Sequence, residues 1–206
     1  MLRRLLLASG LLALAGCAEP TWAPEAEVQM ALYRAEGPST LTVYTVESTE
    51  RGNGAHSALM VNGSHRALFD PAGTFKHPRA PERNDVHFGM SEDVVAVFID
   101  YHARETYNVR VQEIEVSPEV AARAMALIQD HGAVPKAQCN VAVTRILSQL
   151  PGFQDVPRGF YPKKTADWLS NYPGVTEIVI SDDDADDNHG VLLKAAEPVQ
   201  ITGVDR

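Results

Sequence analysis

The sequence has few thiols, a deficit of positive charge, and no long apolar run beyond its first residues. Of 206 residues only two are cysteines, Cys17 and Cys139. Acidic residues outnumber basic ones by 27 to 18, which gives a formal net charge of −9 and excludes the basic surface that nucleic-acid binding needs. After residue 16 no apolar stretch is long enough to span a bilayer. Apolar residues still make up 45% of the chain, so one domain can form a hydrophobic core.

The first sixteen residues have the pattern of a secretory signal peptide. Arg3 and Arg4 precede an apolar run that ends in Leu14-Ala15-Gly16, directly before Cys17. This ending resembles a bacterial lipoprotein signal, and the resemblance implies cleavage before Cys17 and lipid on its sulfur. Each methylene that the acyl chains bury contributes about 0.8 kcal/mol to membrane attachment. The alternative is an ordinary secretory signal that happens to contain a cysteine.

The expected location follows from this resemblance. Ala18 follows Cys17, so the acidic retention signal known in enterobacteria is missing, and an outer-membrane, periplasm-facing anchor is favoured. Residues 17–38 mix Pro, Glu and Ala with little pattern and are predicted to be a tether between lipid and domain. With Cys17 modified, Cys139 is the only remaining thiol, so no intramolecular disulfide can form.

Residues 39–206 are predicted to form a single α+β domain. Strands are expected over 41–46, 55–61, 66–69, 107–116 and 175–180, and helices over about 91–104, 118–131, 135–150 and 162–171. Because short turns join the first strands, the sheet should be mainly antiparallel. The segment 74–90 has no periodicity and is long for a loop, which favours a functional segment. The acidic run 182–187 lacks the glycine and glutamate of a calcium-binding loop and is predicted to be solvated.

Cys139 is predicted to lie in the first turn of the helix 135–150. There the unpaired backbone N–H groups and the helix dipole favour a thiolate, which is the nucleophilic form. However, Val143, Ile146 and Leu150 follow on the same face, and this position equally suits a buried, inert cysteine. On this segment alone both interpretations stay open.

His56 supplies a candidate base for this thiol. It begins the second strand, just after a glycine-rich turn, and could move a proton to and from the reacting atoms. If residues 62–64 form a three-residue turn, His56 lies opposite Asp70, whose carboxylate would fix the imidazole tautomer. A two-residue turn would put Asp70 on the other face, and Asp70 would then be only a turn residue.

Together these motifs resemble a known group of enzymes. The strand histidine in Gly54-Ala55-His56-Ser57 and the distant Gln138-Cys139-Asn140, which opens an apolar helix, resemble the circularly permuted NlpC-like, papain-like cysteine hydrolases. The same order occurs in lecithin:retinol acyltransferase-like proteins. The resemblance covers roughly residues 41–150 and implies a papain-like fold, with an antiparallel sheet packed against the helix that bears the nucleophile. The chain is also similar to uncharacterised lipoproteins of alphaproteobacteria.

Residue by residue, the resemblance implies Cys139 as nucleophile, His56 as base, and Asp70 or alternatively His65 as the residue that orients the base. Many such proteins have an aromatic residue shortly after the cysteine, whereas this chain has Val141-Ala142-Val143. The shape of the pocket therefore departs from the pattern.

The predicted function is that of a membrane-anchored cysteine amidase or peptidase, with cell-wall (peptidoglycan) peptide as the nearest substrate by location. Expected substrate contacts are Gln138, beside the nucleophile, and Arg79 and Arg83 in the segment 74–90. The two arginines could pair with a substrate carboxylate or simply make the segment soluble. The alternatives are a non-catalytic lipoprotein that binds a partner or lipid on the same fold, and acyl transfer to or from lipid.

No cofactor and no metal ion are expected. His77, His87 and His102 do not have the spacing of metal ligands. They are predicted to be surface or capping residues.

Overall fold

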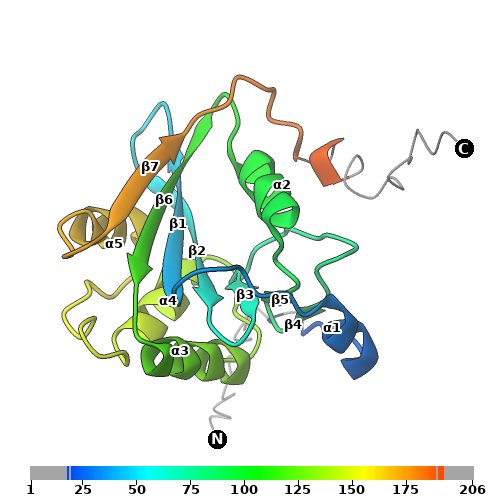
Figure 1. The fold of residues 1–206 in the computed structure, drawn as a ribbon. Helices are drawn as coiled ribbons and strands as arrows, with labels where there is room; N and C mark the ends of the chain where they lie inside the picture. Colours follow the sequence, from blue (N-terminus) through cyan, green and yellow to red (C-terminus); the bar gives the residue numbers. More distant parts are fainter. Residues whose placement is uncertain (1–17, 19, 189, 193–206) are drawn as a thin grey trace, which may run out of the picture.

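The computed structural model describes residues 18, 20–188 and 190–192. The predicted signal peptide 1–16 and Cys17, the predicted site of the lipid, lie outside the described residues. Within the described residues, seven strands form one antiparallel sheet in the order β4-β5-β3-β2-β1-β6-β7 (Figure 1). The predicted α+β class and antiparallel sheet are therefore confirmed.

The elements follow the predicted order closely. The strands are β1 (Thr40–Ser48), β2 (Gly54–Asn62), β3 (Arg66–Phe69), β4 (Glu82–Arg83), β5 (Val86–Phe88), β6 (Tyr107–Glu115) and β7 (Thr176–Ile180). The helices are α1 (Glu25–Ala31), α2 (Glu92–His102), α3 (Pro118–Asp130), α4 (Cys139–Leu147) and α5 (Pro162–Leu169). None of the helices in the described part of the chain is both long enough and apolar enough to cross a membrane.

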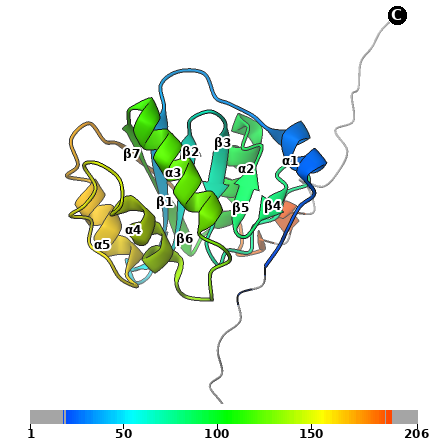
Figure 2. The same cartoon turned by 90° about the horizontal axis from the view of Figure 1, so that it is seen from below.

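The sheet carries helices on both faces. Successive side chains of a strand point to opposite faces, and in β1 both sets contain buried apolar residues. Leu41 and Val43 belong to the core under α3 and α4, whereas Tyr44 belongs to the core under α2. The two views agree with this arrangement, with α3, α4 and α5 on one side of the sheet and α2 on the other (Figures 1 and 2).

The hairpin between β2 and β3 differs from the prediction by one residue. Its loop is Gly63–His65 instead of 62–64, so that Val61 pairs with Ala67. The partner of each β2 residue therefore moves by two positions, which keeps every side chain on its predicted face because the pleat repeats every two residues. Since β3 has only four residues, its pairing with β2 stops at Leu59.

The stretch predicted as a tether, 17–38, packs against the domain from Thr21 onwards, and this corrects the prediction. The backbone N–H of Ala23 donates to the carbonyl of Glu82, and the N–H of Asn84 donates to the carbonyl of Thr21, each at 2.9 Å. Helix α1 then buries Val28 in the core. Val28 thus adds to the core, and the hydrogen bonds of Thr21 and Ala23 fix the segment to the domain, so that it is not a flexible linker.

The acidic run 182–187 is largely exposed, as predicted, and one of its residues, Asp184, pairs with a buried arginine. Arg104 has a side chain only 3% exposed, and its guanidinium donates to Asp184 at 3.2 Å and to Asp100 at 2.7 Å. Carboxylate oxygens of Asp100, Asp182 and Asp184 lie within 4.8 Å of one another. Because Arg104 already pairs with two of these groups, ion pairing accounts for their proximity.

Candidate active site

Cys139 is the first residue of α4 and follows a strained turn. Ala137 has φ of 65°, in the left-handed region that non-glycine residues rarely adopt. The sequence predicted a helix that starts at residue 135. The conformation of Ala137 prevents this early start, so the helix begins at Cys139 and the thiol lies at its N-terminus. Cys139 is 7% exposed, so its sulfur lies at the edge of the core.

Two backbone N–H groups near Cys139 help to lower the pKa of its thiol. One belongs to Ser57 of β2 and the other to Asn140, the second residue of α4. Ser57 lies in the part of β2 that β3 no longer covers. Because β3 is short, it does not pair with β2 at Ser57. The start of α4 approaches the sheet at this position.

His56 and Asp70 meet at the same place. Asp70 directly follows β3 and is 1% exposed, and its Oδ1 lies 2.6 Å from Nε2 of His56. Since Nε2 is occupied by Asp70, Nδ1 is the ring nitrogen that this contact leaves free. The imidazole ring also interacts with the Cys139 thiol. The structure thus brings together the three residues predicted as nucleophile, base and orienting group. His65, the alternative orienting residue, lies in the hairpin loop against Phe88.

The electrostatics of the trio favour charge separation. Burial lowers the pKa of His56, but the charge and hydrogen bond of Asp70 and the interaction with Cys139 outweigh burial and raise it to about 10. Burial raises the pKa of Asp70, but His56 outweighs burial and holds it at about 2. At neutral pH the pair is therefore an imidazolium and a carboxylate.

The same balance acts on the nucleophile. Burial raises the pKa of the Cys139 thiol, but the hydrogen bond and charge of His56, followed by the N–H groups of Ser57 and Asn140, bring it below its ordinary value. A lowered pKa means a larger thiolate fraction at neutral pH. Since the thiolate is the nucleophilic form of cysteine, the lowered pKa increases the reactivity expected of Cys139.

Asn140 fixes the start of α4 to its surroundings. Its side chain is 1% exposed, accepts a hydrogen bond from the hydroxyl of Ser57 at 3.1 Å, and donates to the carbonyl of Gly159 at 2.8 Å. The amide thus joins β2 to the loop before α5. Because all these partners are buried or partly buried, the network holds the cysteine turn against the histidine strand.

His102, predicted as a surface or capping residue, is instead a neighbour of the site. Its ring stacks on that of His56, with centroids 5.6 Å apart and an angle of 6° between the planes. Its Nδ1 lies 2.9 Å from the carbonyl oxygen of Phe98. Burial, followed by the charge of His56, lowers the pKa of His102 to about 4 although Asp70 opposes this. His102 is therefore neutral at pH 7.

This buried neutral histidine should make the protein sensitive to acid. In the unfolded chain His102 takes up a proton below about pH 6.5, whereas in the folded protein it does so only near pH 4. Stability is therefore present above pH 6.5 and is lost as the pH falls toward 4. The free energy of unfolding should fall between pH 7 and pH 4 by up to about 3 kcal/mol less in His102→Phe than in the parent protein. Urea unfolding of both proteins from pH 7 to pH 4 measures the difference, and parallel pH profiles would contradict the assignment.

A metal ion has potential ligands here, but they are already engaged. One ligand atom from each of His56, Asp70 and His102 lies within 4.8 Å of the others. However, His56 Nε2 and Asp70 Oδ1 are directly hydrogen-bonded at 2.6 Å, and an ion would have to break this contact. The geometry fits a hydrogen-bonded dyad better than a metal centre.

Two of the three predicted substrate contacts lie elsewhere, and this corrects the prediction. Arg83 donates to the carboxylate of Glu25 at 2.9 Å and stacks on Trp22, so it fastens the N-terminal segment to the domain. Arg79 pairs with Asp93 at the start of α2. Only Gln138 stays beside Cys139, where its side chain makes no capping hydrogen bond.

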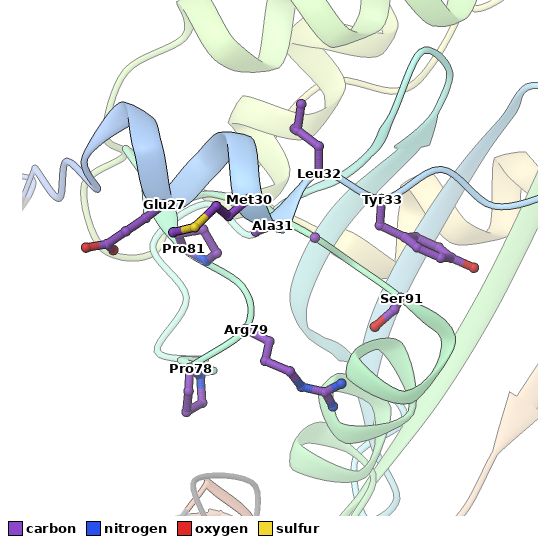
Figure 3. Close-up of a pocket in the computed structure, with 10 residues that line it drawn as sticks. Glu27, Met30, Ala31, Leu32, Tyr33, Pro78, Arg79, Pro81 and Ser91 are labelled. Carbon is purple, nitrogen blue, oxygen red and sulfur yellow. The ribbon is translucent and has the colours of Figure 1, made fainter. Parts of the chain in front are cut away.

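Arg79 also lines a pocket with a volume of about 500 Å³, which lies between α1 and the segment before α2 (Figure 3). Figure 3 shows Met30 and Tyr33 from the α1 side and Pro78, Pro81 and Arg79 from the other side. No cysteine or histidine lines this pocket. The residues that line this pocket therefore give no reason to connect it with the chemistry of Cys139.

The sequence interpretation missed two features of the site. His102 could have been found, because it lies four residues after Phe98 on the buried stripe of its helix and therefore faces the side of the sheet that carries His56. The second feature is the loop 157–164, whose cationic and aromatic residues were not connected with Cys139. Its composition was visible, but its position beside α4 follows only from the fold.

Comparison with known proteins finds no match, whether with protein families, with curated proteins or with solved structures.

Proposed function

We propose that this protein is a cysteine hydrolase with a papain-like arrangement, acting on amide bonds. The observation that carries the proposal is the meeting of Cys139, His56 and the buried Asp70, which come from three separate segments of the chain. A hydrogen-bonded base beside a thiol at a helix N-terminus, with a third group that orients the base, is the arrangement that nucleophilic catalysis requires.

In the proposed reaction the Cys139 thiolate attacks the substrate carbonyl carbon. The first N–H groups of α4 stabilise the oxyanion that forms. His56, protonated, gives its proton to the leaving amine as the carbon–nitrogen bond breaks, which leaves an acyl group on the sulfur. Neutral His56 then takes a proton from water, and the resulting hydroxide releases the acid and restores the thiolate. Asp70 keeps the imidazole oriented and stabilises its charged form throughout.

The location belongs to the same proposal. A lipid on Cys17 would anchor the protein to the cell envelope, at the outer membrane and facing the periplasm. There, peptidoglycan peptide is the nearest amide substrate by compartment. The alternative is a non-catalytic lipoprotein that binds a partner or lipid, and the low exposure of Cys139, 7%, is the observation in its favour. Acyl transfer to or from lipid would use the same three residues.

Alkylation of Cys139 separates the enzyme from the alternative. In the mature protein with Cys17→Ser, Cys139 is the only thiol. We expect iodoacetamide to label it at pH 6, because the lowered pKa supplies thiolate where an ordinary cysteine, with a pKa of about 8.5, has almost none. His56→Gln, which keeps a polar partner for Asp70, should shift the pH dependence of labelling to higher pH. Mass spectrometry measures the rates, with Cys139→Ala as the unlabelled control.

The same alkylation experiment can also contradict the hydrolase proposal. If Cys139 reacts only after denaturation, and His56→Gln leaves the labelling unchanged, Cys139 is an inert core residue and the hydrolase proposal fails.

A further inference from the structure

We call the segment 157–164 the cationic loop; it comprises the loop before α5 and the first three residues of that helix. Its positive charge is an exception in an acidic protein. Residues 156–166 include Arg158, Lys163 and Lys164 and no aspartate or glutamate, whereas the whole chain has a net charge of −9. A local excess of positive charge against such a background attracts anions. The cationic loop is therefore the part of the surface near α4 and α5 where a negatively charged group would bind.

The cationic loop lies beside the candidate active site. It lines a pocket of about 180 Å³ together with Asn140, the neighbour of Cys139. The side chain of Asn140 also donates to the carbonyl of Gly159 within the loop, at 2.8 Å. A substrate in this pocket would thus lie next to the residue that follows the nucleophile.

The cationic loop also touches the strand that bears the base. A Cβ atom added to Gly54, two residues before His56, would lie 2.6 Å from the backbone nitrogen of Lys163. Only glycine allows this close approach between the start of β2 and the start of α5. The loop is therefore fixed relative to both the nucleophile and the base.

Two of the three cations in the cationic loop are available to a ligand. Lys163 pairs with Asp167 at 2.9 Å. Among the described residues, neither Arg158 nor Lys164 has an acidic partner, and both are exposed. The nitrogen Nζ of Lys164 lies over the ring of Tyr161, 5.0 Å from its centroid. This pairing keeps the charge near an aromatic surface without neutralising it.

The same loop exposes apolar surface. Phe160 is 62% exposed and Tyr161 is 66% exposed, which is unusual for side chains of this size. Both line the pocket together with Arg158 and Lys164. The pocket therefore combines two flat apolar side chains with two unneutralised cations.

We propose that the cationic loop selects the substrate: it binds an anionic group, such as a carboxylate or phosphate, that is attached to an apolar or planar part of the molecule whose amide bond is cleaved. Arg158 and Lys164 pair with the anion, and Phe160 and Tyr161 cover its apolar neighbour. The inference rests on the proposed function of Cys139, since it describes the substrate of that reaction.

A pair of alkylating reagents tests the inference without a known substrate. Iodoacetate and iodoacetamide place the same CH₂ group on sulfur and release iodide, and they differ chiefly in charge. In the Cys17→Ser protein at low salt, we expect the ratio of the two rate constants, iodoacetate over iodoacetamide, to fall about four-fold in Arg158→Gln/Lys164→Gln, or about two-fold for each charge. Salt at 1 M should bring the ratio of the parent protein close to that of the double variant.

A control of the same chemistry lies on α3. Arg123, whose guanidinium donates to the carbonyl of Gln149 just after α4 at 3.0 Å, loses one positive charge in Arg123→Gln, as at each position of the double variant, and this change should leave the ratio unchanged. If the ratio of the double variant equals that of the parent while both reagents still label Cys139, the loop inference is wrong. If neither reagent labels Cys139, the proposed function itself fails.

A second arm distinguishes a soluble anion from a lipid headgroup. Co-sedimentation of the Cys17→Ser protein with phosphatidylglycerol vesicles should be weak and should not change in Arg158→Gln/Lys164→Gln. Strong binding that the double variant abolishes, together with an unchanged reagent ratio, would make the cationic loop a membrane contact and overturn the substrate role.

Discussion

His56→Ala should reduce the free energy of unfolding by about 3–5 kcal/mol at pH 7, because it leaves a buried carboxylate without its partner. Asp70 is 1% exposed, and its Oδ1 has His56 as its partner at 2.6 Å. Its Oδ2 already has no hydrogen-bond partner among the described residues. Removal of the imidazole therefore leaves neither oxygen paired, and urea unfolding at pH 7 measures the cost.

The pH dependence identifies the cause of this loss. In the parent protein, the lowered pKa of Asp70, about 2, gives stability that is present above about pH 3.8 and is lost as the pH falls through 2. The raised pKa of His56, about 10, gives stability that is fully present below about pH 6.5 and is lost as the pH rises through 10. In His56→Ala, burial should raise the pKa of Asp70, so the variant should become more stable as the pH falls from 7 to 5.

A double variant controls for lost packing. His56→Ala/Asp70→Ala removes both charges and should be more stable at pH 7 than His56→Ala alone. The exposed pair of Lys163 and Asp167 is a contrast, and Lys163→Ala should change stability by less than about 1 kcal/mol. Strictly additive effects of the two substitutions would mean that His56 and Asp70 do not form a coupled ion pair.

Gly73→Ala should disable the site through Asp70. A Cβ atom at this position would lie 1.9 Å from Oδ2 and 2.3 Å from Cγ of Asp70. The carboxylate cannot move aside freely, because its side chain is fully buried and bound to His56. We expect a loss of about 2–3 kcal/mol, as for other overpacked interiors. Labelling of Cys139 at pH 6 should also slow markedly, because a displaced Asp70 no longer supports the charged imidazole.

The hairpin loop offers a glycine that tolerates the same change. A Cβ atom on Gly63 would lie 3.4 Å from the Cβ of Ala121, which is an ordinary contact. Gly63→Ala should therefore keep both stability and labelling close to those of the parent protein. A Gly73→Ala protein with the stability and the pH profile of the parent would show that Asp70 does not need its observed position.

The sequence predicted the positions of site residues best where these positions depend on the pattern of neighbouring residues. Cys139 could be assigned to a helix start, because an apolar stripe follows it, although Ala137 moved that start by four residues. Asp70 could be placed on the face of His56 despite a wrong turn, since the error shifted the register by two residues and the pleat has the same period. An error of one residue would have separated them.

The sequence was least informative where a role depends on a distant partner. Arg83 carried the same charge in either interpretation, and only the packing of Glu25 and Trp22 around it showed that it fastens the N-terminal segment. Lys164 is the opposite case: no pattern in the sequence singled it out, and among the described residues it has no acidic partner. Local pattern can predict pairs four residues apart on a helix, such as Lys163 with Asp167, but not the pair of Arg83 with Glu25, which joins residues far apart in the sequence.

The packed N-terminal segment limits how far the protein could reach. Only residues 18–20 separate Cys17 from Thr21. The carbonyl of Thr21 accepts a hydrogen bond from the backbone N–H of Asn84, so it is already held by the domain. An extended chain spans at most about 3.5 Å per residue, so a lipid on Cys17 would keep the domain within about 14 Å of the bilayer surface. The proposed reaction of Cys139 would then take place on a domain held close to the membrane surface. Height above the lipid, as much as chemical structure, would decide which bonds it could cleave.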